Sequence, residues 1–281
     1  MSTILETRGL THVYGAGTPF ERVALDHVDL KIEKGEILGV IGHTGSGKST
    51  LIQHLNGLLQ PSEGEVLLDG KSIWDAKGKC ARETRFRVGL VFQYPEYQLF
   101  AQTVEKDVGF GLKYSRLSRE EKQERVRWAL EQMGFSYEEI KDQSPLSLSG
   151  GEKRRLNLLR VLMEAPNVLI LDEPTNDLDI TTLTILEDYL DHYDGIVITV
   201  SHDRYFLDRV VHRIFAFEEN GKLCQYEGGY TDYHRRAEEE GKFVDTAGDS
   251  FRKNEETANV QEKQATEDSR STWKHENKLK F

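Results

Sequence analysis

The chain has few cysteines, no long apolar run and no excess of positive charge, and each of these features narrows its function. Only two cysteines, Cys80 and Cys224, occur in 281 residues. They lie far apart and lack metal-ligand spacing, so we expect packing residues in a reducing compartment and no disulfide framework. No stretch approaches the ~18 uninterrupted apolar residues of a membrane span, and the N-terminus has no charged-then-apolar signal sequence. A soluble, cytosolic protein is expected, and any membrane-embedded partner would be a separate chain.

The charge balance is acidic. With a formal net charge of −11, the chain is not expected to bind nucleic acid directly or to be drawn non-specifically to an anionic membrane surface. Its length allows one large α/β domain with a tail, or two small domains, with a proper core in either case. The motifs favour the first arrangement.

A glycine-rich segment with the pattern G-x-x-x-x-G-K-[ST] follows an apolar stretch, Glu36–Ile41, and precedes residues with helical apolar spacing, Leu51–Leu55. Strand, loop and helix in this order are typical of a phosphate-binding loop, whose backbone N–H groups and helix N-terminus face a polyphosphate. Lys48 is expected to reach the β- and γ-phosphates, and the Ser49 hydroxyl to bind Mg²⁺. The alternative is a glycine-rich turn that binds nothing. The expected nucleotide-contacting residues are Gly42, His43, Thr44, Gly45, Ser46, Gly47, Lys48, Ser49 and Thr50.

Residues 3–32 alternate polar and apolar positions around a break at Gly15–Pro19, which predicts two antiparallel strands joined by a loop. Tyr14 precedes this break. Its ring is placed either to stack on adenine, an interaction of roughly 1–3 kcal/mol, or to remain a half-buried strand tyrosine. Another strand is predicted at residues 65–70.

A strand at 87–92 is predicted to end at Gln93, before an aromatic, proline-marked loop, Tyr94–Phe100. The Gln93 amide oxygen is a candidate contact for Mg²⁺ and for the attacking water, although a glutamine at a strand end is usually just solvated. From Thr103 to Met133 the apolar residues fall at helical spacing, which predicts a helical insert. The aromatic residues of the loop, with Phe110, form either the small core of this insert or a groove for a partner's helix.

A second helix start rich in N–H groups occurs at Ser149, Gly150 and Gly151, with Ser149 placed as the N-cap. One phosphate loop cannot use both helix starts within one small site. We therefore expect these three residues to contact the nucleotide of another copy.

The apolar strand Val168–Glu173 places two carboxylates at its C-terminal edge, where open α/β sheets bind their ligands. Asp172 is expected to hold Mg²⁺, and Glu173 to polarise the attacking water, a role that contributes typically ~10²–10⁴-fold. Either acid alone could be a capping residue. A further buried strand, Ile196–Val200, leads to His202, which is expected to hydrogen-bond the γ-phosphate and register its presence, although a lone histidine is more often structural.

These elements predict an α/β fold with a mixed sheet core, an antiparallel β subdomain and a helical subdomain at about residues 95–165. The nucleotide-binding domain is expected to span 1–237. From residue 238 to 281 charged residues are frequent and large apolar residues are scarce, so we expect a polar tail that is either disordered or a fragment of a linker helix.

Together these motifs resemble those of an ATP-binding cassette (ABC) ATPase, a P-loop NTPase. The resemblance assigns Walker A to Gly42–Thr50, the Q-loop to Gln93, the signature to Leu148–Glu152, Walker B to Val168–Glu173, the D-loop to Asn176–Asp179 and the switch histidine to His202. It implies a head-to-tail dimer with two ATP molecules at the interface, each held by the Walker A of one cassette and the signature of the other.

The chain resembles two subfamilies of ABC ATPases. Residues 1 to about 145 are similar to the ATPase subunit of energy-coupling-factor (ECF) importers of vitamins and metal ions, in the stretches Thr18–Glu21, Ile41–Leu58 and Val91–Phe100. In that family the loop after the Q-loop glutamine, here Tyr94–Phe100, helps to receive a coupling helix of a membrane scaffold subunit. From about Leu148 the chain instead resembles the ABC-F group, cytosolic two-cassette ATPases that act on ribosomes, in the stretches Ser149–Leu159, Asp172–Asp179 and Ser201–Asp208.

The sequence thus predicts an ATP-binding and ATP-hydrolysing subunit of an ECF-type importer, a transport-coupled translocase at the inner face of the cell membrane. It would drive uptake of a vitamin or metal ion through separate membrane subunits, with ATP and Mg²⁺ as cofactors. A second cassette, in a homodimer or heterodimer, and a membrane scaffold are the expected partners. The alternatives are an ABC-F-type ATPase that acts on the ribosome and a hybrid cassette with poor turnover.

Overall fold

The computed structural model describes residues 3–92, 98–113, 115–176, 178–218 and 221–240. All of them belong to one compact unit, Met1–Lys242. Gln93, most of the loop Tyr94–Phe100 and residues 241–281 of the predicted tail lie outside the described residues.

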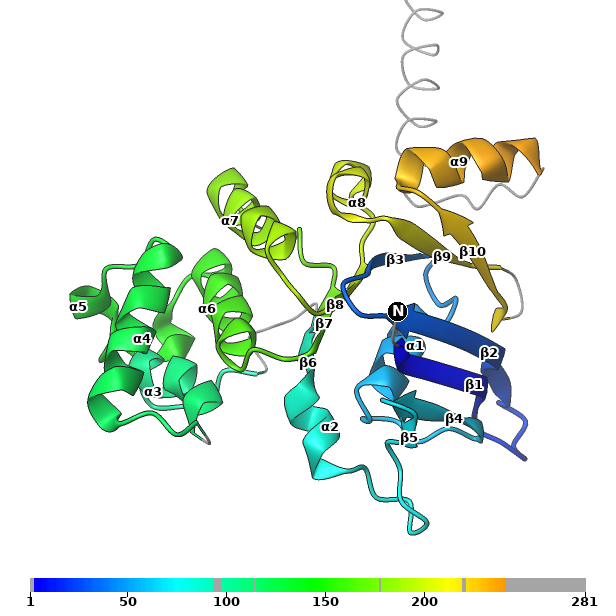
Figure 1. Cartoon of the computed structure of the whole chain (residues 1–281), viewed down its shortest axis with the longest axis horizontal. Coiled ribbons are helices and arrows are strands. Elements are labelled where there is room, and N and C mark those ends of the chain that lie inside the picture. The colour runs from blue at the N-terminus through cyan, green and yellow to red at the C-terminus, as the bar shows by residue number, and fades with distance from the viewer. Residues whose placement is uncertain (1–2, 93–97, 114, 177, 219–220, 241–281) are drawn as a thin grey trace, which may run out of the picture. The chain divides into compact units, whose positions relative to one another are not determined.

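Two sheets carry the fold (Figure 1). One is a four-stranded antiparallel sheet in the order β2-β1-β4-β5, and the other has six strands in the order β10-β9-β3-β8-β7-β6. The first sheet comprises β1 (Thr3–Tyr14), β2 (Arg22–Glu33), β4 (Glu63–Leu68) and β5 (Lys71–Ser72). The second comprises β3 (Ile37–Ile41), β6 (Val88–Val91), β7 (Val168–Asp172), β8 (Ile196–Val200), β9 (Arg213–Phe217) and β10 (Leu223–Glu227). Its strands are parallel except for β10, so the segments that follow β3, β7 and β8 leave at the same edge.

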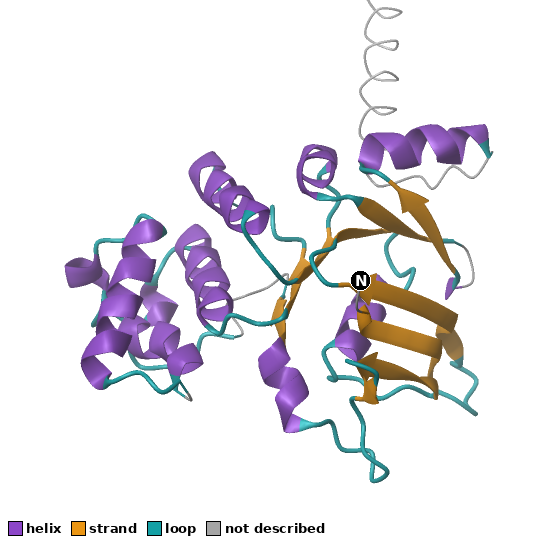
Figure 2. Ribbon diagram, viewed as in Figure 1, coloured by secondary structure: helices purple, strands orange, loops and turns teal. Residues whose placement is uncertain are grey.

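The helices are distributed along the whole described chain (Figure 2). Their bounds are α1 (Lys48–Leu55), α2 (Arg82–Arg87), α3 (Val104–Val108), α4 (Arg119–Gln132), α5 (Tyr137–Ile140), α6 (Gly150–Met163), α7 (Ile180–Asp191), α8 (Arg204–Val210) and α9 (Tyr230–Glu239), with 3₁₀ turns η2 (Gly109–Leu112) and η3 (Pro145–Ser147). The predicted mixed sheet core, antiparallel β part and helical part are all present.

Each face of the six-stranded sheet buries its own apolar cluster, because side chains alternate between faces along a strand. On one face, Leu38 and Ile170 pack with apolar residues of α1 and of the four-stranded sheet. On the other face, Leu169 and Leu171 pack with apolar residues of α6, α7 and α8. Helices α1 and α6, which carry the two expected phosphate-binding ends, therefore pack on opposite faces of one sheet.

The helical insert is present, as predicted. Between Thr103 and Met133 it consists of α3, η2 and α4. Helix α4 has its own start, because the Ser118 side chain accepts the Glu121 N–H while the Glu121 carboxylate accepts the Ser118 N–H. Phe100 and Phe110 pack edge to face with ring centroids 5.0 Å apart, and both stay exposed, so these two aromatics do not form the core of the insert.

Candidate nucleotide-binding and hydrolysis site

The glycine-rich loop runs from the end of β3 into α1, as the sequence predicted. Gly47 is the N-cap residue of α1 and has a φ of 111°. A Cβ at Gly47 would collide with the Ala24 carbonyl oxygen and lie 3.3 Å from the Phe217 ring. Only glycine fits this turn, and the N–H groups of the first turn of α1 point out of it without intrahelical acceptors.

The Lys48 ammonium lies inside the loop. Its Nζ donates to the carbonyl oxygens of Gly42, at 2.6 Å, and His43, at 3.0 Å. An ammonium has three donors, so one remains for a ligand. Burial lowers the pKa of Lys48, while the negative charges of Glu173 and Asp172 act to raise it. The Ser46 Oγ is buried and has no hydrogen-bond partner among the described residues, so a phosphate oxygen would satisfy polar groups that the chain leaves open.

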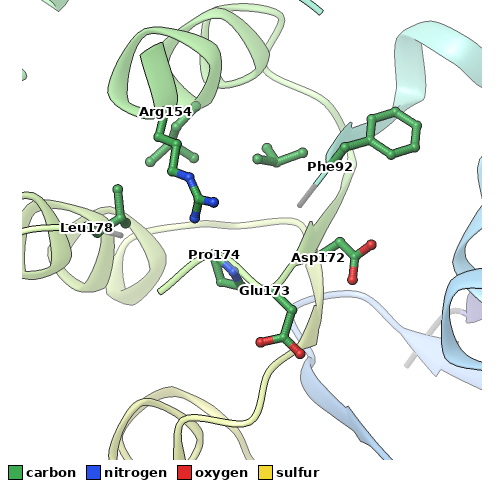
Figure 3. A pocket seen from close by; sticks show the side chains of 8 residues that line it. Phe92, Arg154, Asp172, Glu173, Pro174 and Leu178 are labelled. Atoms are coloured by element: carbon green, nitrogen blue, oxygen red, sulfur yellow. The ribbon is translucent and has the colours of Figure 1, made fainter. Parts of the chain in front are cut away.

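Asp172 and Glu173 stand at the C-terminal end of β7, as predicted, and their side chains leave the chain in different directions (Figure 3). Glu173 adopts a φ of 50°, unusual for a residue with a Cβ and frequent at functional sites, and its N–H donates to the Val200 carbonyl oxygen at 2.7 Å. Burial raises the pKa of Asp172 to about 6 and that of Glu173 to about 7. The adjacent Asp172 charge adds to the rise at Glu173, so protonation of this carboxyl is accessible near neutral pH.

His202 lies against Glu173. Its Nε2 lies 3.3 Å from Glu173 Oε1, and its backbone N–H donates to Glu173 Oε2 at 3.3 Å. Partial burial and the nearby Lys48 charge lower the pKa of His202, which favours the neutral imidazole. The charges of Lys48 and Asp172 also act on the Glu173 carboxyl.

The residues expected to hold Mg²⁺ fit that ion. In the part of the chain that the structure describes, no group of three or more His, Cys, Asp or Glu side chains is placed to bind a metal. Mg²⁺ at phosphoryl-transfer sites uses only one or two protein ligands beside phosphate oxygens and waters. The exposed Ser49 hydroxyl on α1 and the Asp172 carboxylate at the end of β7 supply oxygen ligands of the required kind.

Ser149 caps α6, as predicted from the sequence. Its hydroxyl accepts the Glu152 N–H at 3.4 Å and donates to Glu152 Oε2 at 2.7 Å, while its own N–H donates to the same oxygen at 2.8 Å. Gly150 and Gly151 form the first turn of α6. None of these residues lines the pocket over the glycine-rich loop, whose described lining is Tyr14, Arg22, Ala24, Gly45, Gly47, Lys48, Ser49 and Thr50.

Two arginines that the sequence reasoning missed contact the proposed motifs. The Arg22 guanidinium donates to the Gly45 carbonyl oxygen at 2.8 Å. Arg22, at the start of β2, pairs with Tyr14, at the end of β1, and both residues line the same pocket. Arg154 projects from α6 toward the pocket beside Asp172 and Glu173 (Figure 3) and donates to the Asn176 carbonyl oxygen. The hairpin break before Arg22 was the available signal for the first of them.

The chain is similar in sequence to known proteins. The family model described as ABC transporter matches residues 25–176. The Energy-coupling factor transporter ATP-binding protein EcfA2 of Clostridium tetani is 46% identical over 219 residues, which cover 76% of each chain. The EcfA2 protein of Clostridium perfringens is 45% identical over 233 residues, which cover 79% of this chain and 80% of that protein.

Solved structures are similar as well. CbiO1 from Clostridium perfringens, described as part of the ABC transporter complex cbiONQ, superposes with a TM-score of 0.67 at 33% identity and covers 84% of this chain and 95% of its own. The cassette MJ0796, in a dimeric post-hydrolysis state bound to ADP and Pi, gives a TM-score of 0.68 at 26% identity over 80% of this chain and 98% of its own.

The chain belongs to the ABC transporter family, and as a member of it the chain binds and hydrolyses ATP. Within that family it groups with the energy-coupling factor transporter ATP-binding proteins. A match of 219 residues is longer than the segment of about 145 residues that resembled ECF ATPases, so this similarity continues into the second half. These relatives give no support to a separate ABC-F origin of that half.

No helix among the described residues has the length and apolarity that crossing a membrane requires.

Proposed function

We propose that this ATPase subunit of an ECF-type importer works as half of a composite site, with its own phosphate loop completed by the signature of a second cassette. The opposite placement of α1 and α6 on the sheet carries the proposal, because the two phosphate-binding ends of one chain pack against different apolar clusters. Ser149, Gly150 and Gly151 are also absent from the described lining of the pocket over the glycine-rich loop, so a second molecule would have to bring its own α6 start to that pocket. The dimeric state of the similar cassette MJ0796 with ADP and Pi supports this arrangement.

The chemistry follows from the grouped side chains. Lys48 and the loop N–H groups bind the β- and γ-phosphates, and the Tyr14 ring stacks on adenine. Glu173 polarises the attacking water, and His202, held against Glu173 at 3.3 Å, contacts the γ-phosphate. Ser49, Asp172 and Gln93 would hold Mg²⁺, which would supply positive charge to offset the charge that develops on the phosphate oxygens. Gln93 enters the proposal from its sequence position alone.

The output of the cycle is motion of separate membrane subunits. The segment Tyr94–Phe100 would contact a scaffold subunit at the inner face of the cell membrane, and its described end supports this role. Phe100 is 60% exposed beside the exposed Phe110 ring, which leaves an aromatic pair available to a partner. The transported solute would be a vitamin or a metal ion, selected by another subunit. The expected domain limits, 1–237 with a tail from 238, are also part of this proposal, although α9 continues to Glu239.

Mixing two inactive variants tests the composite site. A Lys48→Ala chain lacks a working phosphate loop, and a Ser149→Arg chain blocks the signature with a large side chain. Each variant alone should be inactive, whereas a mixed dimer contains one intact loop opposite one intact signature and should regain up to half of the parental ATPase rate. If the mixed variants form dimers with MgATP but recover no activity, the composite site is wrong.

Glu173→Gln tests the hydrolytic role. It should lower the ATPase rate by about 10²–10⁴-fold and leave ATP binding intact, because the amide keeps the shape of the side chain. An unchanged rate would show that Glu173 does not activate the water. Co-purification from membranes tests the partner, since recovery with ribosomes and not with a membrane scaffold subunit would favour the ABC-F alternative.

A further inference from the structure

Two histidines connect the Tyr14 ring to the helix that follows the phosphate loop. His12 lies two residues before Tyr14 on β1, on the same face of the strand, and its ring packs edge to face against the Tyr14 ring with centroids 4.5 Å apart. The His12 ring also packs against His54, with centroids 4.7 Å apart. His54 lies in the last turn of α1 and is completely buried. Neither histidine has a part in binding or hydrolysis as proposed above.

Hydrogen bonds join these two rings to each other and to the backbone of α1. His54 Nδ1 lies 2.7 Å from the Thr50 carbonyl oxygen, which can only accept, so this nitrogen carries a hydrogen. Burial lowers the pKa of His54, whereas hydrogen bonds to the backbone of Thr50 and Gln60 act to raise it. His12 Nδ1 lies 3.2 Å from His54 Nε2. Polar contacts therefore run from His12 through His54 to the backbone of Thr50.

Thr50 contacts both Tyr14 and His54. Its hydroxyl lies 3.2 Å from the Tyr14 hydroxyl, while its carbonyl accepts from His54. Tyr14 is thus tied to the first turn of α1 directly through its hydroxyl and indirectly through the His12 ring. The Tyr14 ring is 44% exposed, so it can meet a ligand while its inner side is held.

We propose that His12 and His54 are positioning residues that hold the Tyr14 ring ready for adenine and couple this platform to the helix that binds the phosphates. The inference rests on the proposed function, in which Tyr14 stacks on the base. An exposed tyrosine without support would have to be immobilised when the nucleotide binds. Immobilising one such side chain typically weakens binding by about 2- to 10-fold, and this is the contribution assigned to the histidine pair.

Two ligands separate the base from the phosphates: a non-hydrolysable ATP analogue and tripolyphosphate, which has no adenine. Their dissociation constants would be measured by calorimetry on the full chain. His12→Ala should weaken the analogue by about 2- to 10-fold and leave tripolyphosphate unchanged. Tyr14→Ala should weaken the analogue at least as much, and His12→Ala should add nothing in the Tyr14→Ala background.

Matched variants separate this role from general damage. His12→Asn retains an N–H near the Nδ1 position and should keep more affinity than His12→Ala. His212→Ala changes an exposed histidine next to the start of β9, distant in sequence from the platform, and should alter neither dissociation constant. Imidazole ¹⁵N spectra should show a hydrogen on Nδ1 of His54, which faces the Thr50 carbonyl oxygen.

Equal losses for the two ligands, no loss for the analogue, a further loss in the Tyr14→Ala background, or a His54 Nδ1 without a hydrogen would overturn the inference. A different result would refute the proposed function itself. If Lys48→Ala weakens neither ligand, the loop does not bind phosphates, whatever the histidines do. If Lys48→Ala weakens both but Tyr14→Ala weakens neither, the phosphate site stands and the histidine platform is refuted.

Discussion

Gly150→Ala should leave the fold of the isolated chain intact and strongly lower its ATPase rate. Gly150 is the first residue of α6, is exposed, and has no atom within 4 Å of the position that a Cβ would occupy. Its φ lies outside the left-handed region, so alanine can adopt its backbone conformation. Gly47 is the opposite case, because its φ of 111° and the Ala24 carbonyl oxygen exclude a side chain. Nothing in the described chain therefore requires glycine at 150.

Gly150→Ala should preserve or raise the melting temperature but lower the ATPase rate. Alanine is favoured over glycine by up to about 1 kcal/mol inside a helix, and less of this applies at a first turn. The melting temperature should be unchanged or rise by at most roughly 2–4 °C for a chain of this size. A phosphate oxygen hydrogen-bonded to the α6 N–H groups approaches to about 3 Å, whereas a methyl carbon needs about 3.5–4.0 Å. Displacing one such donor typically costs about 10²–10³-fold in rate.

The assay combines melting temperature with ATPase rate per chain, and Gly109→Ala is the matched control. A Cβ at Gly109 would meet only Val126, at an ordinary contact distance of 3.7 Å, so both measurements should stay near the parental values. A Gly150→Ala variant that hydrolyses ATP at the parental rate would refute the docking of a nucleotide on α6. A melting temperature lowered by several degrees would instead refute the open space seen at this position.

Other perturbations test separate contacts. Arg22→Ala removes the cation that is hydrogen-bonded to Gly45. The ATP affinity measured by calorimetry should fall several-fold at low salt and less at high salt, because salt screens an exposed charge. A loss of affinity that does not depend on salt would contradict this. Ser149→Ala loses the cap of α6 and should lower the unfolding free energy by about 0.5–2 kcal/mol in denaturant melts, whereas Ser149→Asp should keep most of it; equal losses would exclude capping. Burial raises the pKa of Asp107, so its contribution to stability falls as pH rises through that raised pKa. Asp107→Asn should accordingly gain melting temperature relative to the parent near pH 8 more than near pH 4, and the reverse order would refute the sign.

Local patterns allowed the chemical motifs to be located from the sequence. The glycine-rich loop, the acid pair after β7 and the cap at Ser149 each depend on residues within one strand–turn–helix unit, so their spacing determines the structure directly. The same kind of pattern was available at Ser118, where serine precedes Glu121 by three residues. The prediction treated residues 103–133 as one helical region and gave no separate start for α4.

The contacts of Arg22 and His12 depend on pairing between segments far apart in the chain. Arg22 reaches Gly45 across 23 positions, and His12 reaches His54 across 42. Such contacts require the register of β1 with β2 and the packing of α1, neither of which a single sequence determines. A histidine on a strand and a histidine on a helix each have ordinary structural explanations alone. Their common function becomes visible only when the two rings are found against Tyr14.

The placement of the two phosphate-binding helix starts also follows from sheet geometry. Helices α1 and α6 each bury one apolar side, but the buried residues of the two helices belong to different clusters. The described lining of the pocket over the glycine-rich loop includes none of Ser149, Gly150 and Gly151. The capping box at Ser149 already satisfies that residue's own N–H and the Glu152 N–H, so the remaining exposed amides of α6 are free to meet a ligand that another molecule carries. A glycine at 150 with empty space around it is what such an approach requires.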